Sequence, residues 1–482
     1  MDNVKNLAVK GAFWNGLQLI VNASFTFIIR LVLAKLLLPD QFGLVGMATV
    51  FTGLIQVIND LGIGAALIQR KDDDLNETHF HTAFWTGVIW SAFLYVIISF
   101  AVGPLAASFY GEPLLNKLIP VLSIGILFSP VNMVHKAQLT KQMNFKKMAF
   151  IDNVSNIVVG SVALGLAFLG AGVWSLVFNS VASYAIAMPL YFIATGWLPK
   201  LIWNSESFKD VFGFGVYTTG TNIVNYAINS VDYLFIGKLL STEALGAYTF
   251  AFILTDTFKS RLMGVINNVM YPLYGKKQSD PESLKRYYLK VVNYNSIIVY
   301  PIMVLLFGLG EPLILNFFGE KWIMAIPPLR ILSLSVMVAM MVNSNTSLIR
   351  GMGKPELELK LQFVKALIFI PTLIIGIYYY GIIGAAWAVL INKVIAVLIA
   401  QYTFNRLLHI SVGTMEFLNA VKEPWIASAI SYLALYFLYQ VAGVHYIISG
   451  ILFMIVYCGV IYVMLYGELK SQLQQLKLSS KQ

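Results

Sequence analysis

The sequence predicts an all-α polytopic membrane protein, and three observations support this fold class. The chain has 482 residues, of which 58% are hydrophobic and only 12% are charged, whereas soluble domains carry about 25% charged residues. The mean hydropathy is +0.74. Apolar runs long enough to cross about 30 Å of hydrocarbon follow one another along the chain, and no large soluble domain interrupts them.

Fourteen transmembrane helices are predicted from these runs. The chain starts with a basic segment that leads into a long apolar run without a small-residue cleavage site, so we expect a retained first helix and not a signal peptide. The predicted spans are, in order, 10–33, 42–66, 82–108, 115–135, 148–169, 172–196, 209–236, 245–271, 287–309, 327–349, 360–379, 382–405, 424–440 and 445–466.

The distribution of Lys and Arg orients these helices. With a cytoplasmic N-terminus, 23 of the 33 basic residues fall in cytoplasmic segments, and four fall on the opposite side: Lys35, Lys117, Lys238 and Lys321. Cytoplasmic loops of membrane proteins carry such an excess of positive charge, so we expect both termini in the cytoplasm. The basic loops face anionic lipid, which makes membrane lipids expected partners. Charges dispersed in this way give no support for nucleic-acid binding.

Three pairs of similar segments indicate an internal duplication. LAKLLLPDQFG (33–43) resembles IGKLLSTEALG (236–246), FYGE (109–112) resembles FFGE (317–320), and GAGVWSLV (170–177) resembles GAAWAVL (384–390). The pairs occur in the same order, with offsets of 203 and 208 residues for the first two and an offset of 213 for the third, which aligns Trp174 with Trp387. We therefore expect two parallel six-helix lobes related by a pseudo-two-fold axis along the membrane normal. The predicted lobes are 1–200 and 201–410, and 411–482 adds two helices and a cytoplasmic tail.

Polar side chains recur on one face of the first helix of each predicted lobe. Steps of three and four residues place them on a single helical face. Two stripes matched in register favour a hydrated cavity between the lobes over simple packing contacts. The stripes are Asn15, Gln18, Asn22, Thr26 and Arg30 in the first span, and Thr218, Thr221, Asn225, Asn229 and Asp232 in the seventh.

Six basic residues fall inside predicted spans, where an ion at the centre of a helix costs at least about 2.5–3.5 kcal/mol. In the eighth span, Asp256 and Lys259 are three residues apart and can pair on one face, whereas Arg261 points elsewhere and needs its own partner or an aqueous space. Arg330 and Lys365 lie near span ends, where the charge can reach the interface. The cations predicted to line the cavity and bind an anionic substrate are Arg30, Lys259, Arg261 and Lys393.

The sequence lacks patterns for nucleotide, metal or disulfide chemistry. It has no G-x-x-x-x-G-K-[ST] motif. Its single cysteine, Cys458, cannot form an internal disulfide, and its five histidines are scattered. We therefore expect no metal and no cofactor, and we expect that the protein is not an enzyme.

The segment RLVLAKLLLPDQFGLVGMATVFTGLIQVINDLGIGAALIQRKD (30–72), with TAFW (82–85) and GVWSLV (172–177), resembles polysaccharide exporters of the colanic acid and teichuronic acid type. These belong to the polysaccharide transporter branch of the multidrug/oligosaccharidyl-lipid/polysaccharide exporter superfamily. The resemblance covers nearly the whole chain. It implies twelve core helices in two lobes with two further helices, in the bacterial cytoplasmic (inner) membrane.

The resemblance also implies a function and roles for residues. The implied function is flipping of undecaprenyl-pyrophosphate-linked oligosaccharide for capsule, exopolysaccharide or O-antigen synthesis, with polysaccharide polymerase and chain-length machinery as partners. In related flippases basic residues of the first and eighth helices line a cationic cavity, which by position implies Arg30 and either Lys259 or Arg261. Drug-exporting relatives use acidic residues for ion coupling, for which Asp60, Asp232 and Asp256 are the candidates here.

Two alternatives remain open at this point. An ion-coupled multidrug exporter would share the fold, but the excess of cations within the spans argues against it. A membrane glycosyltransferase or polymerase would need charged residues in a sizeable outer loop, whereas the longest predicted outer loop, 310–326, is short and nearly neutral.

Overall fold

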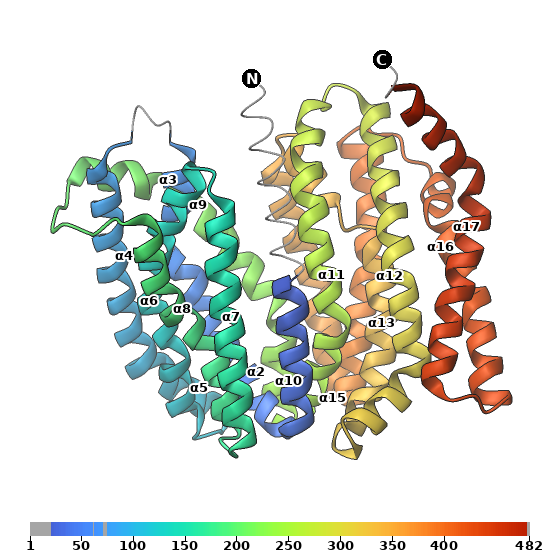
Figure 1. Ribbon diagram of the computed structural model, residues 1–482, viewed down its shortest axis with the longest axis horizontal. Helices are drawn as coiled ribbons and strands as arrows, with labels where there is room; N and C mark the ends of the chain where they lie inside the picture. Colours follow the sequence, from blue (N-terminus) through green and yellow to red (C-terminus); the bar gives the residue numbers. More distant parts are fainter. Residues whose placement is uncertain (1–20, 61, 71–74, 480–482) are drawn as a thin grey trace. The chain divides into compact units, whose positions relative to one another are not determined.

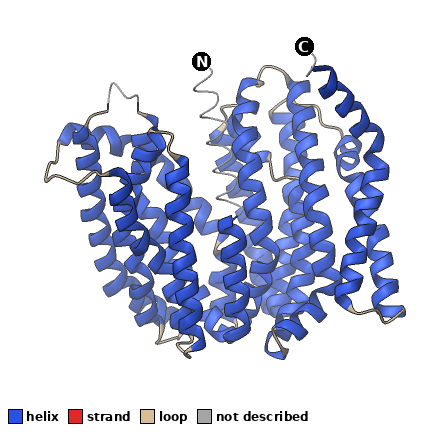
Figure 2. Ribbon diagram, viewed as in Figure 1, coloured by secondary structure: helices blue, strands red, loops and turns tan. Residues whose placement is uncertain are grey.

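The computed structural model describes residues 21–60, 62–70 and 75–479, and within these ranges the chain is helical and contains no β-strand (Figure 2). The first described helix covers residues 21–36. The α-helices that follow are α2 (Pro39–Asp60), α3 (Ile63–Gln69), α4 (Glu77–Ile97), α5 (Gly103–Tyr110), α6 (Leu115–Lys141), α7 (Phe145–Phe168), α8 (Val173–Thr195), α9 (Ser205–Asn229), α10 (Val231–Leu239), α11 (Thr242–Lys276), α12 (Pro281–Phe317), α13 (Ile326–Met340), α14 (Asn345–Gly351), α15 (Pro355–Tyr402), α16 (Thr414–Tyr436) and α17 (Tyr446–Ser479).

All fourteen predicted spans overlap helix in the described part of the chain. Nine helical stretches among the described residues are long and apolar enough to cross a membrane, and one of them, Pro355–Leu407, covers two predicted spans. The chain is therefore a multi-pass membrane protein. Among the described helices, α9, α11 and α16 are not part of these nine stretches, and α9 and α11 carry the polar residues of the seventh and eighth spans.

Short polar residues start several helices, because their side chains accept hydrogen bonds from the first free backbone N–H groups. Asn76 accepts from the backbone N–H of His79 at the start of α4. Asn204 accepts from the N–H groups of Glu206 and Ser207 at the start of α9. Asp280 does the same for α12, and Pro281 follows it at a position where no N–H is needed. These caps fix where the helices begin.

A glycine separates the two spans within α15. Gly381 has φ 58° and ψ −139°, a conformation open to glycine because it lacks a Cβ. Gly172, in the turn before α8, has nearly the same angles, φ 56° and ψ −129°. Since 381 − 172 is 209, the backbone favours an offset of 209 at this turn. The pairing of Trp174 with Trp387 at 213 is therefore shifted by about one helical turn.

The first pair of repeated segments meets in a reciprocal backbone contact. A Cβ added to Gly43 would lie 1.8 Å from the carbonyl oxygen of Thr242, and one added to Gly246 would lie 1.7 Å from that of Pro39. At the offset of 203, Gly43 corresponds to Gly246 and Pro39 to Thr242. Each half of this contact therefore mirrors the other, as expected from a duplication with a local two-fold axis. We call it the glycine contact.

The chain divides into two compact units, Met1–Phe250 and Ala251–Gln482. In unit 1, α6 packs against α2, α4 and α8, and α7 packs against α8 (Figure 1). The helices α9 and α10 also belong to this unit, and α9 packs on α2, α3 and α4. The lobe boundary at 200/201, which was drawn from the repeat, stays a prediction.

Unit 2 is built around α12, which packs against α13 and α16, while α13 packs on α15 and α16 packs on α17. Aromatic residues of α12, of α16 and of the π-helical turn that follows α15 (Thr403–Leu407) form one core cluster, in which Tyr288 stands edge-on to Phe404 and parallel to Phe417. The hydroxyl of Tyr288 donates to the carbonyl oxygen of Met341 at 2.8 Å, so the buried ring keeps a polar partner.

Candidate functional site

Unit 1 contains a polar cavity with a volume of ≈ 410 Å³. Pockets of roughly 300–1,000 Å³ are typical of sites for small ligands. Most of its lining side chains carry an amide, hydroxyl or charged group. The lining residues come from the first helix, α3, α6, α7 and α8: Asn22, Gly64, Ile68, Ser129, Asn132, Met133, Lys136, Ala137, Asp152, Ser155, Asn156, Ser183, Tyr184 and Ala187. We call it the unit 1 cavity.

An ion pair between two helices forms part of the cavity wall. The ammonium of Lys136 in α6 lies 3.1 Å from one carboxylate oxygen of Asp152 in α7 and 3.3 Å from the other. From α8, the hydroxyl of Tyr191 donates to Asp152 at 2.7 Å. The side chain of Lys136 is 41% exposed and that of Asp152 20%. The pair therefore borders space that water can enter, and three helices meet at one carboxylate.

Two buried polar atoms in the same wall have no hydrogen-bond partner within the described part of the chain. They are the hydroxyl oxygen of Ser155 and the side-chain oxygen of Asn132, whose residues are 2% and 5% exposed. The amide nitrogen of Asn132 donates to the carbonyl of Tyr184 at 2.9 Å, which fixes the orientation of the amide. A buried polar group without a partner costs about 1–3 kcal/mol, so these two atoms have a hydrogen-bonding capacity that no described residue uses.

The stripe of the first span is described in part. Asn15 and Gln18 lie outside the described residues. Asn22 lines the unit 1 cavity, and its side-chain oxygen accepts from the hydroxyl of Thr26 at 3.1 Å, as one helical face requires. Arg30 lies on the same helix and is exposed. The stripe therefore reaches a cavity within unit 1, whereas a cavity between the lobes stays a prediction.

The stripe of the seventh span ends in a buried carboxylate. Asn225 is half-buried and Asn229 is exposed near the end of α9, while the side chains of Thr218 and Thr221 lie outside the described part. Asp232 is 5% exposed and accepts from the hydroxyl of Tyr248 at 2.9 Å. The backbone N–H of Tyr233 donates to its other oxygen. These bonds stabilise the charge of Asp232 in a structural contact. Asp60, the last residue of α2, is exposed.

The charged segment of α11 lies in unit 2. Asp256 and Lys259 form the ion pair predicted from their spacing. Their side chains are 24% and 20% exposed. The side chain of Arg261 lies outside the described residues, so its role stays a prediction. Lys393 in α15 is half-buried. Arg330 of α13 pairs with Glu311 of α12 at 2.6 Å.

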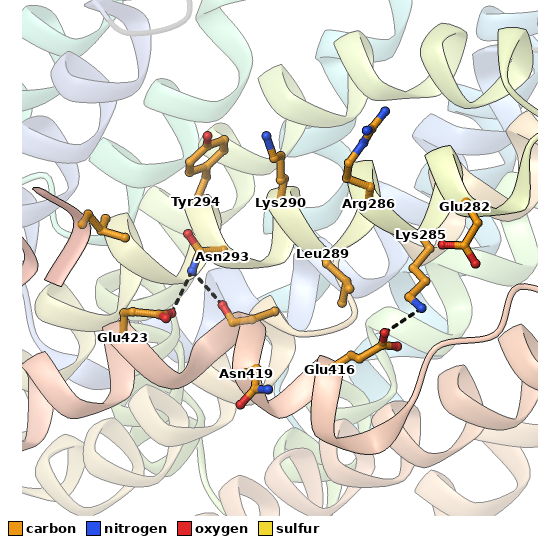
Figure 3. Close-up of a pocket in the computed structure, with 12 residues that line it drawn as sticks. Glu282, Lys285, Arg286, Leu289, Lys290, Asn293, Tyr294, Glu416, Asn419 and Glu423 are labelled. Atoms are coloured by element: carbon orange, nitrogen blue, oxygen red, sulfur yellow. Dashed lines mark hydrogen bonds and ion pairs between the residues drawn. The ribbon is translucent and has the colours of Figure 1, made fainter. Parts of the chain in front are cut away.

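A second polar pocket, of ≈ 390 Å³, lies between α12 and α16 in unit 2 (Figure 3). Lys285 of α12 pairs with Glu416 of α16 at 2.7 Å. About two turns further along α12, the amide of Asn293 donates to the carbonyl of Ala420 at 2.8 Å. Figure 3 shows Arg286 and Lys290 pointing away from α16, on the other side of α12. Paired groups therefore connect the two helices at this pocket, and the side chains of Arg286 and Lys290 point away from the contact between them.

Lys136 and Asp152 are, with Asn132 and Ser155, among the site residues that the sequence interpretation missed. Lys136 is one of the 23 basic residues that the sequence analysis assigns to cytoplasmic segments, and Asp152 has no role there. Their separation of 16 residues fits no helical period. A usable signal exists, because α6 and α7 are joined by a turn at residues 142–144. Opposite charges at similar distances from such a turn face each other across the two helices.

Comparison with known proteins decides the family. Residues 32–327 match the family described as "Polysaccharide biosynthesis protein". The chain belongs to this family. It is 24% identical to the "Teichuronic acid biosynthesis protein TuaB" of Bacillus subtilis (strain 168), over 89% of this chain and 88% of that protein. It is also 24% identical to the "Lipopolysaccharide biosynthesis protein WzxC" of Escherichia coli (strain K12), over 83% and 81% of the two chains.

Solved structures show that the fold of this family member is shared with membrane transporters. The chain aligns with "Lipid II flippase MurJ, inward closed conformation" at a TM-score of 0.74 and 15% identity, over 96% of this chain and all of the other. It aligns with an inward-facing multidrug resistance MATE family transporter at a TM-score of 0.62 and 18% identity, over 82% and 100% of the two chains. At these identities the likeness concerns the fold alone.

Proposed function

We propose that this chain is a flippase that moves undecaprenyl-pyrophosphate-linked oligosaccharide repeat units across the bacterial cytoplasmic membrane. The units would serve capsule, exopolysaccharide or O-antigen synthesis. The observation that carries the proposal is the unit 1 cavity, because it places amide, hydroxyl and charged groups among membrane helices of a polysaccharide biosynthesis protein. The relatives named for teichuronic acid and lipopolysaccharide biosynthesis support a glycan substrate.

The pyrophosphate binding site would be formed by basic residues. Arg30, Lys259 or Arg261, and Lys393 would hold the pyrophosphate through charge-assisted hydrogen bonds, in a cavity between the two lobes. The lobes 1–200 and 201–410 would rock to open that cavity to each side in turn, with both termini in the cytoplasm. Without such a path, a charged and hydroxyl-rich headgroup would pay the full cost of leaving water.

The alternative functions make different demands. An ion-coupled drug exporter would use Asp60, Asp232 or Asp256 as a coupling acid, yet Asp232 is engaged with Tyr248 and Asp256 with Lys259. Deletion of the gene would then raise drug sensitivity and leave polysaccharide export intact. A glycosyltransferase or polymerase would transfer sugar in vitro without moving any lipid between leaflets.

Deletion of the gene tests the flippase directly. We expect the lipid-linked oligosaccharide to accumulate on the cytoplasmic leaflet and surface polysaccharide to disappear, and we expect the wild-type gene to restore both. Arg30→Gln should not restore export, whereas Lys117→Gln, a matched change of an exposed cation at the start of α6, should restore it. Normal surface polysaccharide in the deletion strain would refute the proposal.

A further inference from the structure

The unit 1 cavity contains balanced charge, and this balance limits which ligand it suits. Among its lining residues Lys136 is the cation and Asp152 the anion, and the two are already paired. A pyrophosphate would have to compete with Asp152 for Lys136 and would meet the repulsion of a nearby carboxylate. The cavity therefore suits a polar, hydroxyl-rich and uncharged group better than an anion.

The remaining lining groups match such a ligand. The side-chain oxygens of Ser155 and Asn132, which have no partner within the described ranges, can accept hydrogen bonds, and the hydroxyl of Ser155 can also donate one. The side chain of Gln56 donates to Ser129 at 3.3 Å, which positions a further hydroxyl of the wall. Tyr184 adds an aromatic ring to the lining, and rings of this kind offer an apolar face beside polar groups.

We propose that the unit 1 cavity is a saccharide subsite, which holds one sugar residue of the lipid-linked substrate through its hydroxyl groups. This inference rests on the proposed function and adds to it a place for the sugar that is separate from the cations assigned to the pyrophosphate. The Lys136–Asp152 pair acts here as a positioning element, because it fixes the wall and remains accessible to a hydroxyl ligand. A site built from such groups discriminates strongly against ligands that lack the matching hydroxyl.

Ser155→Ala tests the subsite. The substitution removes a hydroxyl that has no hydrogen bond to lose within the described residues, so the fold should keep its thermal stability. Ser175→Ala is a matched control: Ser175 is fully buried in α8, its hydroxyl also lacks a partner in the described part of the chain, and it does not line the cavity. Purified full-length protein in nanodiscs would be titrated with two lipids. One is undecaprenyl pyrophosphate, and the other is the lipid-linked oligosaccharide extracted from the deletion strain.

We expect Ser155→Ala to weaken binding of the oligosaccharide lipid about 10-fold, the effect of roughly one hydrogen bond. Binding of undecaprenyl pyrophosphate should stay unchanged, and Ser175→Ala should alter neither lipid. Equal binding of the oligosaccharide lipid by Ser155→Ala and wild type would overturn the subsite, as would an equal loss for both lipids. Failure of the wild-type protein to bind either lipid would instead overturn the proposed function, and the subsite with it.

Discussion

The glycine contact and the unit 1 cavity lie in the same unit and are built in opposite ways. At Gly43 and Gly246 two backbones touch, and not even a methyl group fits between them. In the cavity, by contrast, polar side chains leave space, and the oxygens of Ser155 and Asn132 find no partner among the described residues. Dense backbone packing of the first kind fixes a structure, whereas unfilled polar space of the second kind serves a ligand. Changes at the contact should therefore affect folding, and changes in the cavity should affect transport.

The largest effect is expected from Gly43→Ala. Its Cβ would meet the Thr242 carbonyl oxygen at 1.8 Å, and a backbone atom cannot rotate away. Overpacking costs about 1–3 kcal/mol, and we expect the upper end, seen as a large fall in melting temperature of the purified protein. Gly165→Ala in α7 is the control, because no neighbouring atom lies within 4 Å of its added Cβ. It should stabilise the helix by about 0.5–1 kcal/mol. Equal melting temperatures of Gly43→Ala and wild type would contradict the structural role of the glycine contact.

Asp152→Asn should destabilise the protein less than Gly43→Ala does, and its main effect should be on transport. It removes the charge that pairs with Lys136, a hydrogen-bonded interaction worth about 1.5–3 kcal/mol when buried. We expect about 1.5 kcal/mol here, because Lys136 is partly exposed and can be hydrated. Polysaccharide export should fall at least 10-fold in a complementation assay.

Asp210→Asn serves as the control for Asp152→Asn. It breaks another ion pair of unit 1, Arg70–Asp210 at 2.7 Å, which does not line the cavity. Export should persist in this variant. Similar export by both variants would show that loss of an ion pair anywhere in unit 1 has the same effect, contrary to a special role for the cavity.

Asp256→Asn tests whether an ion pair within one helix behaves differently from one that joins two helices. Asp256 and Lys259 lie three residues apart on α11, and pairs of this spacing contribute about 0.2–0.5 kcal/mol. The melting temperature should therefore change little, as in the neighbouring control Thr257→Ala, which loses one hydrogen bond to Ile253 within the helix. A loss of stability as large as that of Asp152→Asn would show that the α11 pair also holds helices together.

The smallest effect on stability is expected from a change at the contact between α12 and α16. Hydrogen bonds from Lys285 and from the backbone N–H of Gly413 lower the pKa of Glu416, which precedes the predicted span 424–440, from its usual 4.5. A lowered pKa stabilises the folded state above pH 4.5, and this contribution is lost as the pH falls through the lower folded-state pKa. Glu416→Gln should therefore reduce the slope of melting temperature against pH below pH 4.5. Near neutral pH this slope should be the same in the variant and the wild type. An unaltered acid slope would contradict this.

The elements that the sequence predicts well are those with a local pattern. Hydropathy locates the helices, because membrane burial acts on every residue of a span. The spacing of Asp256 and Lys259 predicts their pair, because both lie on one helix. The repeat identifies Gly43 and Gly246 as equivalent, although only the structure shows that each glycine touches the other segment.

The elements that escape prediction depend on packing between helices. Lys136, Asp152 and Tyr191 belong to three helices, and no single spacing relates them. Two similar tryptophans suggest an offset of 213, but the glycine conformations at the turn favour 209. Residue identity in apolar helices is a weaker guide to alignment than a backbone angle that glycine adopts readily.

Transport in reconstituted vesicles is the most direct test of the proposed function. Purified protein would be placed in liposomes that contain the lipid-linked oligosaccharide extracted from the deletion strain, and a membrane-impermeant reagent would oxidise the sugars exposed outside. With wild-type protein we predict that sugars from the inner leaflet become accessible over time, and that Asp152→Asn slows this at least 10-fold. An accessible fraction that stays the same as in protein-free liposomes would contradict the assignment of this chain as a flippase.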